Sequence, residues 1–144
     1  MIKKIKYKNK LFALIVRGKY RNKKGISFFT EKKDIQQFGY MNHKKNHINK
    51  HHIHKKQTRK LLHTSEVILI LKGILRVDFY DTKKNYLFSK QIKEKDIIML
   101  VHGAHGFKVI KDVQMIEIKQ GPYITKLDKI KFDGTNESKI KIKK

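Results

Sequence analysis

The sequence lacks cysteine altogether, contains a single proline, and has few acidic residues, with 12 Asp and Glu against 36 Lys and Arg. Without cysteine, disulfide bonds and thiolate metal sites are excluded, so any metal ion must be bound by His, Asp or Glu. The eight glycines are spread along the 144 residues, and no segment has the composition of a long low-complexity linker. We expect a chain of this length to form one globular domain with a modest core.

The sequence also lacks a long apolar run. Near the N-terminus, the run Leu11–Val16 has six residues and ends at Arg17. A secretion signal needs an apolar stretch of roughly 7 to 15 residues, and a membrane helix needs about 20. We therefore expect a soluble, cytoplasmic protein without a membrane partner.

The formal net charge is +24, and nearly all of it comes from lysine. The arginines, whose forked hydrogen bonds read phosphates and guanines, are Arg17, Arg21, Arg59 and Arg76. Lysines occur in every region instead of forming one stripe, which favours a solvated basic surface over a nucleic-acid groove. The sequence thus predicts no specific nucleic-acid partner, although an acidic glycan or a sugar phosphate would still be attracted.

Short apolar, β-rich runs recur about every ten residues, a spacing that is typical of a sandwich or barrel. The runs are LFALIVRG, GISFFT, EVILILKG, ILRVDFYD, NYLFSKQI, DIIMLV, HGFKVI and VQMIEIK. We expect the first two runs to pair as a hairpin across KYRNKK. One short helix is expected over TEKKDIQQFGYM, where Thr30 caps the first turn and Glu31 lies within it.

These patterns divide the chain into three parts. N-terminal strands and the short helix occupy residues 1–39, a barrel occupies 40–123, and a basic, frayed C-terminal tail occupies 124–144. The strand EVILILKG is apolar on both faces, so its outer face needs cover from the N-terminal strands or from a second chain. A homodimer is therefore a further expectation.

Histidine is concentrated between residues 47 and 66, which hold five of the chain's eight histidines and a glutamate. In an extended strand, residues two apart face the same side and lie roughly 6.6 to 6.8 Å apart. His52 and His54 would then converge on one ion, whereas His51 and Ile53 would face away. Five histidines are expected to be solvent-exposed or structural: His43, His47, His51, His63 and His102.

Two further residues complete the candidate metal site. Glu66 opens the apolar strand that must enter the barrel wall, and His105 lies in the glycine-flanked loop VHGAHGF after the run DIIMLV. His63 is the alternative to Glu66, because residues three apart in one strand point to opposite sides. Three imidazoles and a carboxylate suit a divalent Zn, Fe, Mn, Ni or Co ion.

Together these residues resemble the cupins, a family of small double-stranded β-helix barrels of the jelly-roll kind. The family's first motif has two histidines spaced H-x-H, then a glutamate that is followed by six residues and a glycine. Here HIH at 52–54, Glu66 and Gly73 follow this order. The second motif, an acidic residue before a strand, a turn and a third histidine, is similar to DIIMLVHGAHGF with Asp96 and His105.

The resemblance covers about residues 40–120. It implies an all-β jelly-roll barrel with at most one or two short helices, and a divalent metal ion bound by His52, His54, Glu66 and His105. Eleven residues separate His54 from Glu66, more than is usual in the family, so KKQTRKLLHTS is an inserted loop or the glutamate is not a ligand. More narrowly, VDFYD, HGF and IEIKQGPY look like small cupins that are encoded among bacterial surface-polysaccharide genes.

Three functions stay open at this point. The first is a metal-dependent cupin that acts on a small carbohydrate-like or oxygenated substrate, with the ion as Lewis acid. The second is a metal-free sugar-nucleotide isomerase or epimerase with His52 or His54 as general base. The third is a non-catalytic binding module for an acidic glycan. In each case the partner is a small sugar or nucleotide sugar, or a glycan.

No residue can be assigned a catalytic role from these patterns, and whether the chain is an enzyme stays open. Four polar residues near the end of the last strand are suited to line a cavity or an outer strand face: Glu117, Lys119, Gln120 and Tyr123.

Overall fold

The computed structural model describes residues 1–22, 24–124 and 128–143. The chain forms two compact units, which differs from the single unit expected from its length. The first, here called the sheet unit, comprises residues 1–19 and 63–144. The second, here called the hairpin unit, comprises residues 20–62.

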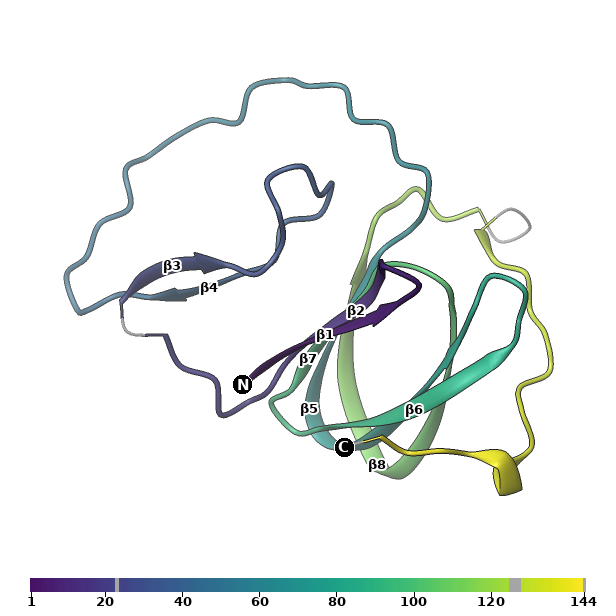
Figure 1. Ribbon diagram of the computed structural model, residues 1–144. Helices are drawn as coiled ribbons and strands as arrows, with labels where there is room; N and C mark the ends of the chain where they lie inside the picture. Colours follow the sequence, from purple (N-terminus) through teal and green to yellow (C-terminus); the bar gives the residue numbers. More distant parts are fainter. Residues whose placement is uncertain (23, 125–127, 144) are drawn as a thin grey trace. The chain divides into compact units, whose positions relative to one another are not determined.

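The sheet unit is built around one antiparallel sheet (Figure 1). Its strands are β1 (Ile2–Tyr7), β2 (Lys10–Val16), β5 (Glu66–Tyr80), β6 (Tyr86–Lys93), β7 (Ile97–Leu100) and β8 (Ala104–Lys119). The strand order is β1-β2-β7-β5-β6, and β8 pairs with β5. A short 3-10 helix, η1 (Glu137–Lys139), follows near the C-terminus.

The predicted all-β class is confirmed, because the described part of the chain contains no helix of seven residues or more. None of its helices has the length and apolar character needed to span a membrane. The antiparallel sheet curls into a half-barrel, which is consistent with a barrel of the jelly-roll kind.

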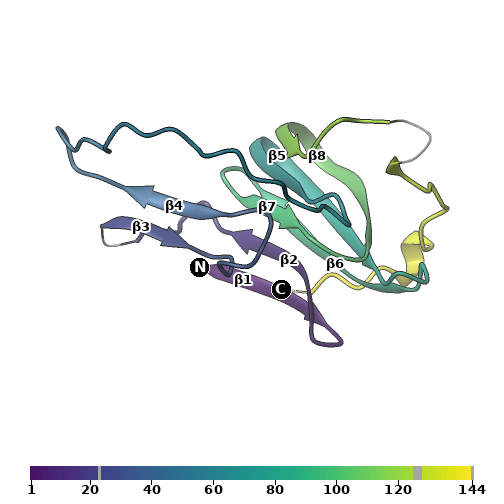
Figure 2. The same cartoon turned by 90° about the horizontal axis from the view of Figure 1, so that it is seen from above.

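The curl depends on a bend in the long ladder that β5 and β8 form. Gly73 has a φ of 90°, and a Cβ there would lie 1.9 Å from the carbonyl oxygen of Asp112, so only glycine fits. The register of the ladder shifts between Ile70 and Leu75, as β-bulges do where a strand bends. The two strands therefore bend together, which Figures 1 and 2 show. The sequence pattern predicted two separate runs in each of these regions. In the structure each region is one continuous strand, β5 or β8.

The apolar core lies on the face that the curl encloses. Its most deeply buried members come from β2, β5, β6 and β7: Ala13, Ile15, Ile68, Ile70, Leu75, Val77, Phe79, Ile92 and Ile98. In the first half of β5 buried and partly buried residues alternate, whereas in the second half every residue from Leu75 to Tyr80 is buried. The core members of β5 change from even-numbered residues before Gly73 to odd-numbered residues after it, which accompanies the shift of register there.

The first hairpin differs from the predicted one. We expected Leu11–Val16 to pair with the run GISFFT, but β2 pairs with β1 on one side and with β7 on the other. Lys8 and Asn9 join β1 to β2, and both have positive φ, at 46° and 61°. Tight two-residue hairpin turns use this conformation, and they bring neighbouring strands together more directly than the longer KYRNKK segment can.

Asp96, the acidic residue of the second cupin-like motif, stabilises this part of the sheet through its carboxylate. Its carboxylate accepts hydrogen bonds from Arg17 Nη1 at 2.6 Å and from the backbone N–H groups of Gly18 and Lys93 at 2.9 Å each. Asp96 is 5% exposed, so the carboxylate is buried with its charge compensated. Its role here is to hold β2 to the turn before β7.

The hairpin unit contains β3 (Gly25–Phe28) and β4 (Gly39–Asn42), which pair with each other. The ring of Phe29 contacts the rings of Tyr20 and Phe38 edge to face, next to the loop that joins β3 to β4. Among the described residues of this unit, only Phe29 has a large apolar side chain that is buried. The unit therefore has a small aromatic cluster in place of a core.

The helix predicted over residues 30–41 is wrong. Thr30 Oγ1 accepts a hydrogen bond from the N–H of Phe38 at 3.0 Å, and Asp34 Oδ2 accepts one from the N–H of Glu31 at 2.7 Å. These bonds close turns between β3 and β4, because short polar side chains compete with helical hydrogen bonds for backbone groups.

The C-terminal segment differs from the frayed tail that we expected. Its end pairs with β6, because the N–H of Ser89 donates to the carbonyl of Lys141 at 2.9 Å and the N–H of Lys143 donates to the carbonyl of Ser89 at 3.0 Å. The described residues 128–143 are thus attached to the sheet unit, although most of their side chains are exposed.

Candidate functional site

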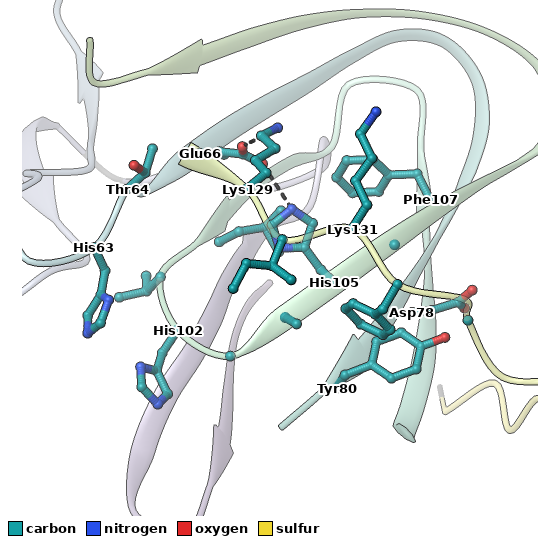
Figure 3. Close-up of a pocket in the computed structure, with 18 of the residues that line it drawn as sticks. His63, Thr64, Glu66, Asp78, Tyr80, His102, His105, Phe107, Lys129 and Lys131 are labelled. Atoms are coloured by element: carbon teal, nitrogen blue, oxygen red, sulfur yellow. Dashed lines mark hydrogen bonds and ion pairs between the residues drawn. The ribbon is translucent and has the colours of Figure 1, made fainter. Parts of the chain in front are cut away.

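A cavity of about 810 Å³ lies in the sheet unit (Figure 3). It is bounded by both ends of β5, the loop before β8, both ends of β8, and the C-terminal segment. Its lining includes His63, Thr64, Glu66, Tyr80, His102, His105, Phe107, Lys119, Gln120, Lys129, Lys131 and Phe132. The cavity combines aromatic walls with several charged groups, as small-molecule sites commonly do.

Glu66 and His105 come from nearly opposite ends of the β5 and β8 ladder. Glu66 pairs with Lys119, and His105 pairs with Phe79, 13 residues further along β5. In a flat sheet this separation would be roughly 40 Å, at about 3.3 Å per residue. The two side chains nevertheless meet, with His105 Nε2 2.9 Å from Glu66 Oε2. The curl of the sheet thus creates the pair.

The pair is held in a partly enclosed and charged environment. The side chain of Glu66 is 6% exposed and that of His105 is 26% exposed. Lys129 Nζ lies 3.1 Å from the other carboxylate oxygen, Oε1. The hydrogen bond with His105 lowers the pKa of Glu66 to about 2, with Lys129 acting in the same direction and burial opposing it. Glu66 is therefore an ionised acceptor at neutral pH, and His105 Nε2 donates to it.

A second pair of imidazoles lies at another part of the cavity, as Figure 3 shows for His63 and His102. Their ring centroids are 5.8 Å apart, and the ring of Phe12 packs edge to face on His102 at 5.3 Å. Burial lowers the pKa of His102, and the neighbouring Lys10 and His63 act in the same direction. His102 is therefore mainly neutral at physiological pH. Both residues were expected to be exposed or structural, and the structure adds that they line the cavity.

The predicted ligands His52 and His54 belong to the hairpin unit, whereas Glu66 and His105 belong to the sheet unit. The imidazole rings of His52 and His54 are 5.0 Å apart, centroid to centroid, at an interplanar angle of 81°. Residues 47–61 form no strand, so the extended geometry on which the strand-parity prediction rested is not present. Polar and basic residues dominate this stretch, and few of its side chains could be buried against a sheet.

The structure therefore brings together Glu66 with His105, and His52 with His54. In the described ranges, no group of three or more His, Cys, Asp or Glu side chains is arranged to hold a metal ion. The four-residue metal site stays a prediction.

Two of the polar residues proposed near the end of β8 do line the cavity, namely Lys119 and Gln120. Gln120 Oε1 accepts a hydrogen bond from the N–H of Ser65 at 2.8 Å, next to Glu66. Lys119 lies over the ring of Tyr123 at 4.6 Å.

Sequence reasoning missed the contribution of the C-terminal segment to the cavity. Lys129, Lys131 and Phe132 come from the part that was read as a frayed tail. Within KIKF at 129–132, basic and apolar residues alternate, and this period of two would have indicated an extended segment packed along a surface.

Comparison of the chain with family models, with curated proteins and with solved structures finds no match in any of the three. The function therefore has to be argued from the cavity itself.

Proposed function

We propose that the chain is a cupin-like protein that binds a small oxygenated, carbohydrate-like molecule in the cavity of the sheet unit. The observation that carries this proposal is the contact between Glu66 and His105 inside the cavity. Two groups able to exchange protons or bind a cation face one another there, beside aromatic side chains and lysines. A sugar offers hydroxyl groups to such donors and acceptors, and apolar ring faces to Tyr80 and Phe107.

We further propose that the pair binds a divalent metal ion. An ionised carboxylate and an imidazole nitrogen are suitable donors for Zn, Fe, Mn, Ni or Co, and both already point at the same place. Glu66 and His105 would hold the ion, and His52 and His54 are the further ligands predicted from the sequence. A bound ion of this kind supplies Lewis-acid polarisation of a carbonyl or hydroxyl oxygen.

A metal-free sugar-nucleotide isomerase or epimerase is the second candidate. The observation that favours it is the orientation of His105, whose ring is held by a buried carboxylate in the manner of a general base and its orienting group. The proton acceptor would then be His105 instead of His52 or His54. A non-catalytic binding module for an acidic glycan would use the same cavity without turnover.

Elemental analysis of protein purified without an affinity tag separates the first candidate from the others. We expect close to one equivalent of a first-row divalent metal per chain, and its loss in His105→Ala. Metal content that is unchanged in His105→Ala and Glu66→Gln would contradict a metal site at this pair.

Ligand binding tests the wider proposal. We expect sugar acids or nucleotide sugars to raise the melting temperature of the wild-type protein and of His51→Ala, but not of His105→Ala. If no member of these classes shifts any of the three proteins, the carbohydrate proposal fails. Turnover of a ligand that binds would separate an enzyme from a binding module.

The remaining expectations are also proposals. We propose a cytoplasmic role in surface-polysaccharide metabolism, on the resemblance of VDFYD, HGF and IEIKQGPY alone. Homodimer formation is supported by β8, which pairs with β5 and exposes several large apolar side chains: Phe107, Val109, Ile110, Met115, Ile116 and Ile118. Sedimentation that shows only monomer at micromolar concentration would remove it.

A further inference from the structure

The described C-terminal residues 128–143, here called the strap, form one side of the cavity and are attached to the sheet unit at several points. The first attachment is an ion-pair cluster around Arg76, which is 5% exposed. Its Nη1 and Nη2 donate to the two carboxylate oxygens of Glu137 at 2.8 Å each, a forked arrangement. Asp78 accepts two further hydrogen bonds from the same guanidinium, and Lys108 lies 3.0 Å from Glu137.

A second attachment is made by Tyr80. Its hydroxyl accepts a hydrogen bond from the N–H of Thr135 at 3.0 Å, and the ring of Phe132 packs edge to face on it at 5.2 Å. Further along, the N–H of Lys141 donates to the hydroxyl of Tyr86 at 2.8 Å. The strap is thus bound along its length by side chains of β5 and β6.

The strap delivers Lys129 to the Glu66 and His105 pair. Lys129 Nζ lies 3.1 Å from Glu66 Oε1, while Oε2 accepts the hydrogen bond from His105. Both carboxylate oxygens therefore have a partner, and one of these partners is a cation. Figure 3 shows Lys129 and His105 on the same carboxylate.

We infer that Lys129 is a built-in cation that competes with a bound divalent ion for Glu66, and that the strap holds it in place. A metal ion held by His105 and Glu66 Oε2 and the ammonium of Lys129 on Oε1 are cations on one carboxylate, so their repulsion weakens the Lys129 contact when the ion binds. Loss of this contact loosens the strap at the cavity, so occupancy of the site and attachment of the strap are coupled. The inference rests on the proposed function in taking Glu66 as a metal-binding group.

The competition is tested with Co²⁺ alone as the probe, by titration calorimetry on the full chain. Lys129→Met removes the ammonium and keeps much of the side-chain volume. Lys131→Met is the matched control, because Lys131 lines the same cavity two residues further along the strap. We expect Co²⁺ to bind at least tenfold more tightly to Lys129→Met than to wild type, with Lys131→Met unchanged.

The gain must depend on Glu66. When Lys129→Met is combined with Glu66→Gln, we expect the gain in Co²⁺ affinity to disappear. Equal affinity of Lys129→Met and wild type, or a gain that survives in the double variant, would overturn the inference and leave the metal proposal standing. Co²⁺ binding that is insensitive to Glu66→Gln in every background would overturn both.

The coupling has a readout that needs no bound metal. In chelator-treated protein, the amide hydrogens of Thr135, Lys141 and Lys143 are protected by the bonds described above. We expect Lys129→Met and Glu137→Gln to speed hydrogen exchange of the strap at least threefold, measured by mass spectrometry, and Lys131→Met to leave it unchanged. Unchanged exchange in Lys129→Met and Glu137→Gln would show that these pairs do not hold the strap, and would overturn the coupling.

Discussion

The sheet unit and the hairpin unit both contain a close pair of candidate ligands, but the two pairs are supported very differently. Glu66 and His105 project from paired strands, and Glu66 is buried and bound by Lys129. His52 and His54 lie in a stretch without regular structure in which all side chains from residue 44 to 62 are exposed. The first pair is positioned by the fold, whereas the second depends on local chain geometry alone.

This difference shows what a sheet contributes to a site. A ladder with buried neighbours fixes the backbone, so a side chain on it has few alternative positions. An exposed segment must lose conformational freedom before its side chains can bind a ligand together, and this cost lowers the affinity. The following predictions test whether the two regions really differ in this way.

The largest effect is expected for a core substitution in the sheet unit. Phe79 is 1% exposed and Ile53 is 91% exposed. Phe79→Ala should lower the free energy of unfolding by about 3 to 5 kcal/mol, whereas Ile53→Ala should change it by less than about 0.5 kcal/mol. Urea denaturation followed by circular dichroism measures both. Comparable losses in the two variants would mean that residue 53 is buried in solution.

The next effect concerns pH. Because the pKa of Glu66 is lowered from 4.5 to about 2, its ionised form stabilises the folded state fully above pH 4.5. This contribution is lost as pH falls from about 4.5 towards 2, and it amounts to roughly 3 kcal/mol at most. The stability gap between wild type and Glu66→Gln, measured by urea denaturation of chelator-treated protein, should therefore narrow between pH 6 and pH 3.

The matched control for pH lies in the hairpin unit. Glu31 pairs with Lys33 at 2.9 Å, but its side chain is 65% exposed. Exposed ion pairs contribute little to stability, so Glu31→Gln should keep a nearly constant offset from wild type over the same pH range. If the two glutamates behave alike, the burial of Glu66 has no energetic consequence.

Metal binding separates the two pairs directly. If the predicted four-residue site forms, His52→Ala and His54→Ala should each weaken metal binding by about 100-fold, which corresponds to about 2.7 kcal/mol, and His51→Ala should not. His105→Ala should have at least as large an effect. Equal metal retention in His52→Ala and His51→Ala would show that the hairpin unit supplies no ligand, and that the sheet unit acts without it.

The smallest effect is expected for nucleic acid. If the lysines form a diffuse surface, duplex DNA binding is weak and is lost at about 0.15 M salt. Neutralising Lys55, Lys56 and Lys60 in the hairpin unit should then reduce low-salt binding no more than neutralising Lys72, Lys83 and Lys111 in the sheet unit. Fluorescence anisotropy measures both. Tight, sequence-dependent binding that only the first triple removes would identify the hairpin unit as a nucleic-acid contact.

The strands of the sheet unit could largely be predicted because their burial produces strong patterns. EVILILKG, DIIMLV and VQMIEIK are strands because nearly every residue is apolar or alternates with polar ones. β1 was missed, because its apolar residues Ile2, Ile5 and Tyr7 are separated by lysines without a regular period of two. The Lys8–Asn9 turn, with asparagine at a positive φ, carries the signal that would have identified the hairpin.

The candidate site could be predicted only in part. Glu66 and His105 were chosen from their place in a family-like motif, and the structure brings them together through a curl that local periodicity does not encode. Lys129 could not be predicted in this way. It is far from Glu66 in the sequence, and their contact depends on the path that the strap takes across the sheet unit. For His52 and His54 the strand assumption failed, since their neighbours are polar and provide no buried face.

The long β5 and β8 ladder also has a consequence for the order of folding. β6 and β7 lie between these strands in the sequence and both pair with β5, so residues 66–119 can assemble from neighbouring chain segments. The strap must close over a finished sheet, and Arg76 and Tyr80 must already be in place to receive it. We expect substitutions in the ladder to slow folding, and substitutions at Glu137 to speed unfolding while leaving the folding rate nearly unchanged. The site would then acquire its carboxylate and imidazole before its lysine.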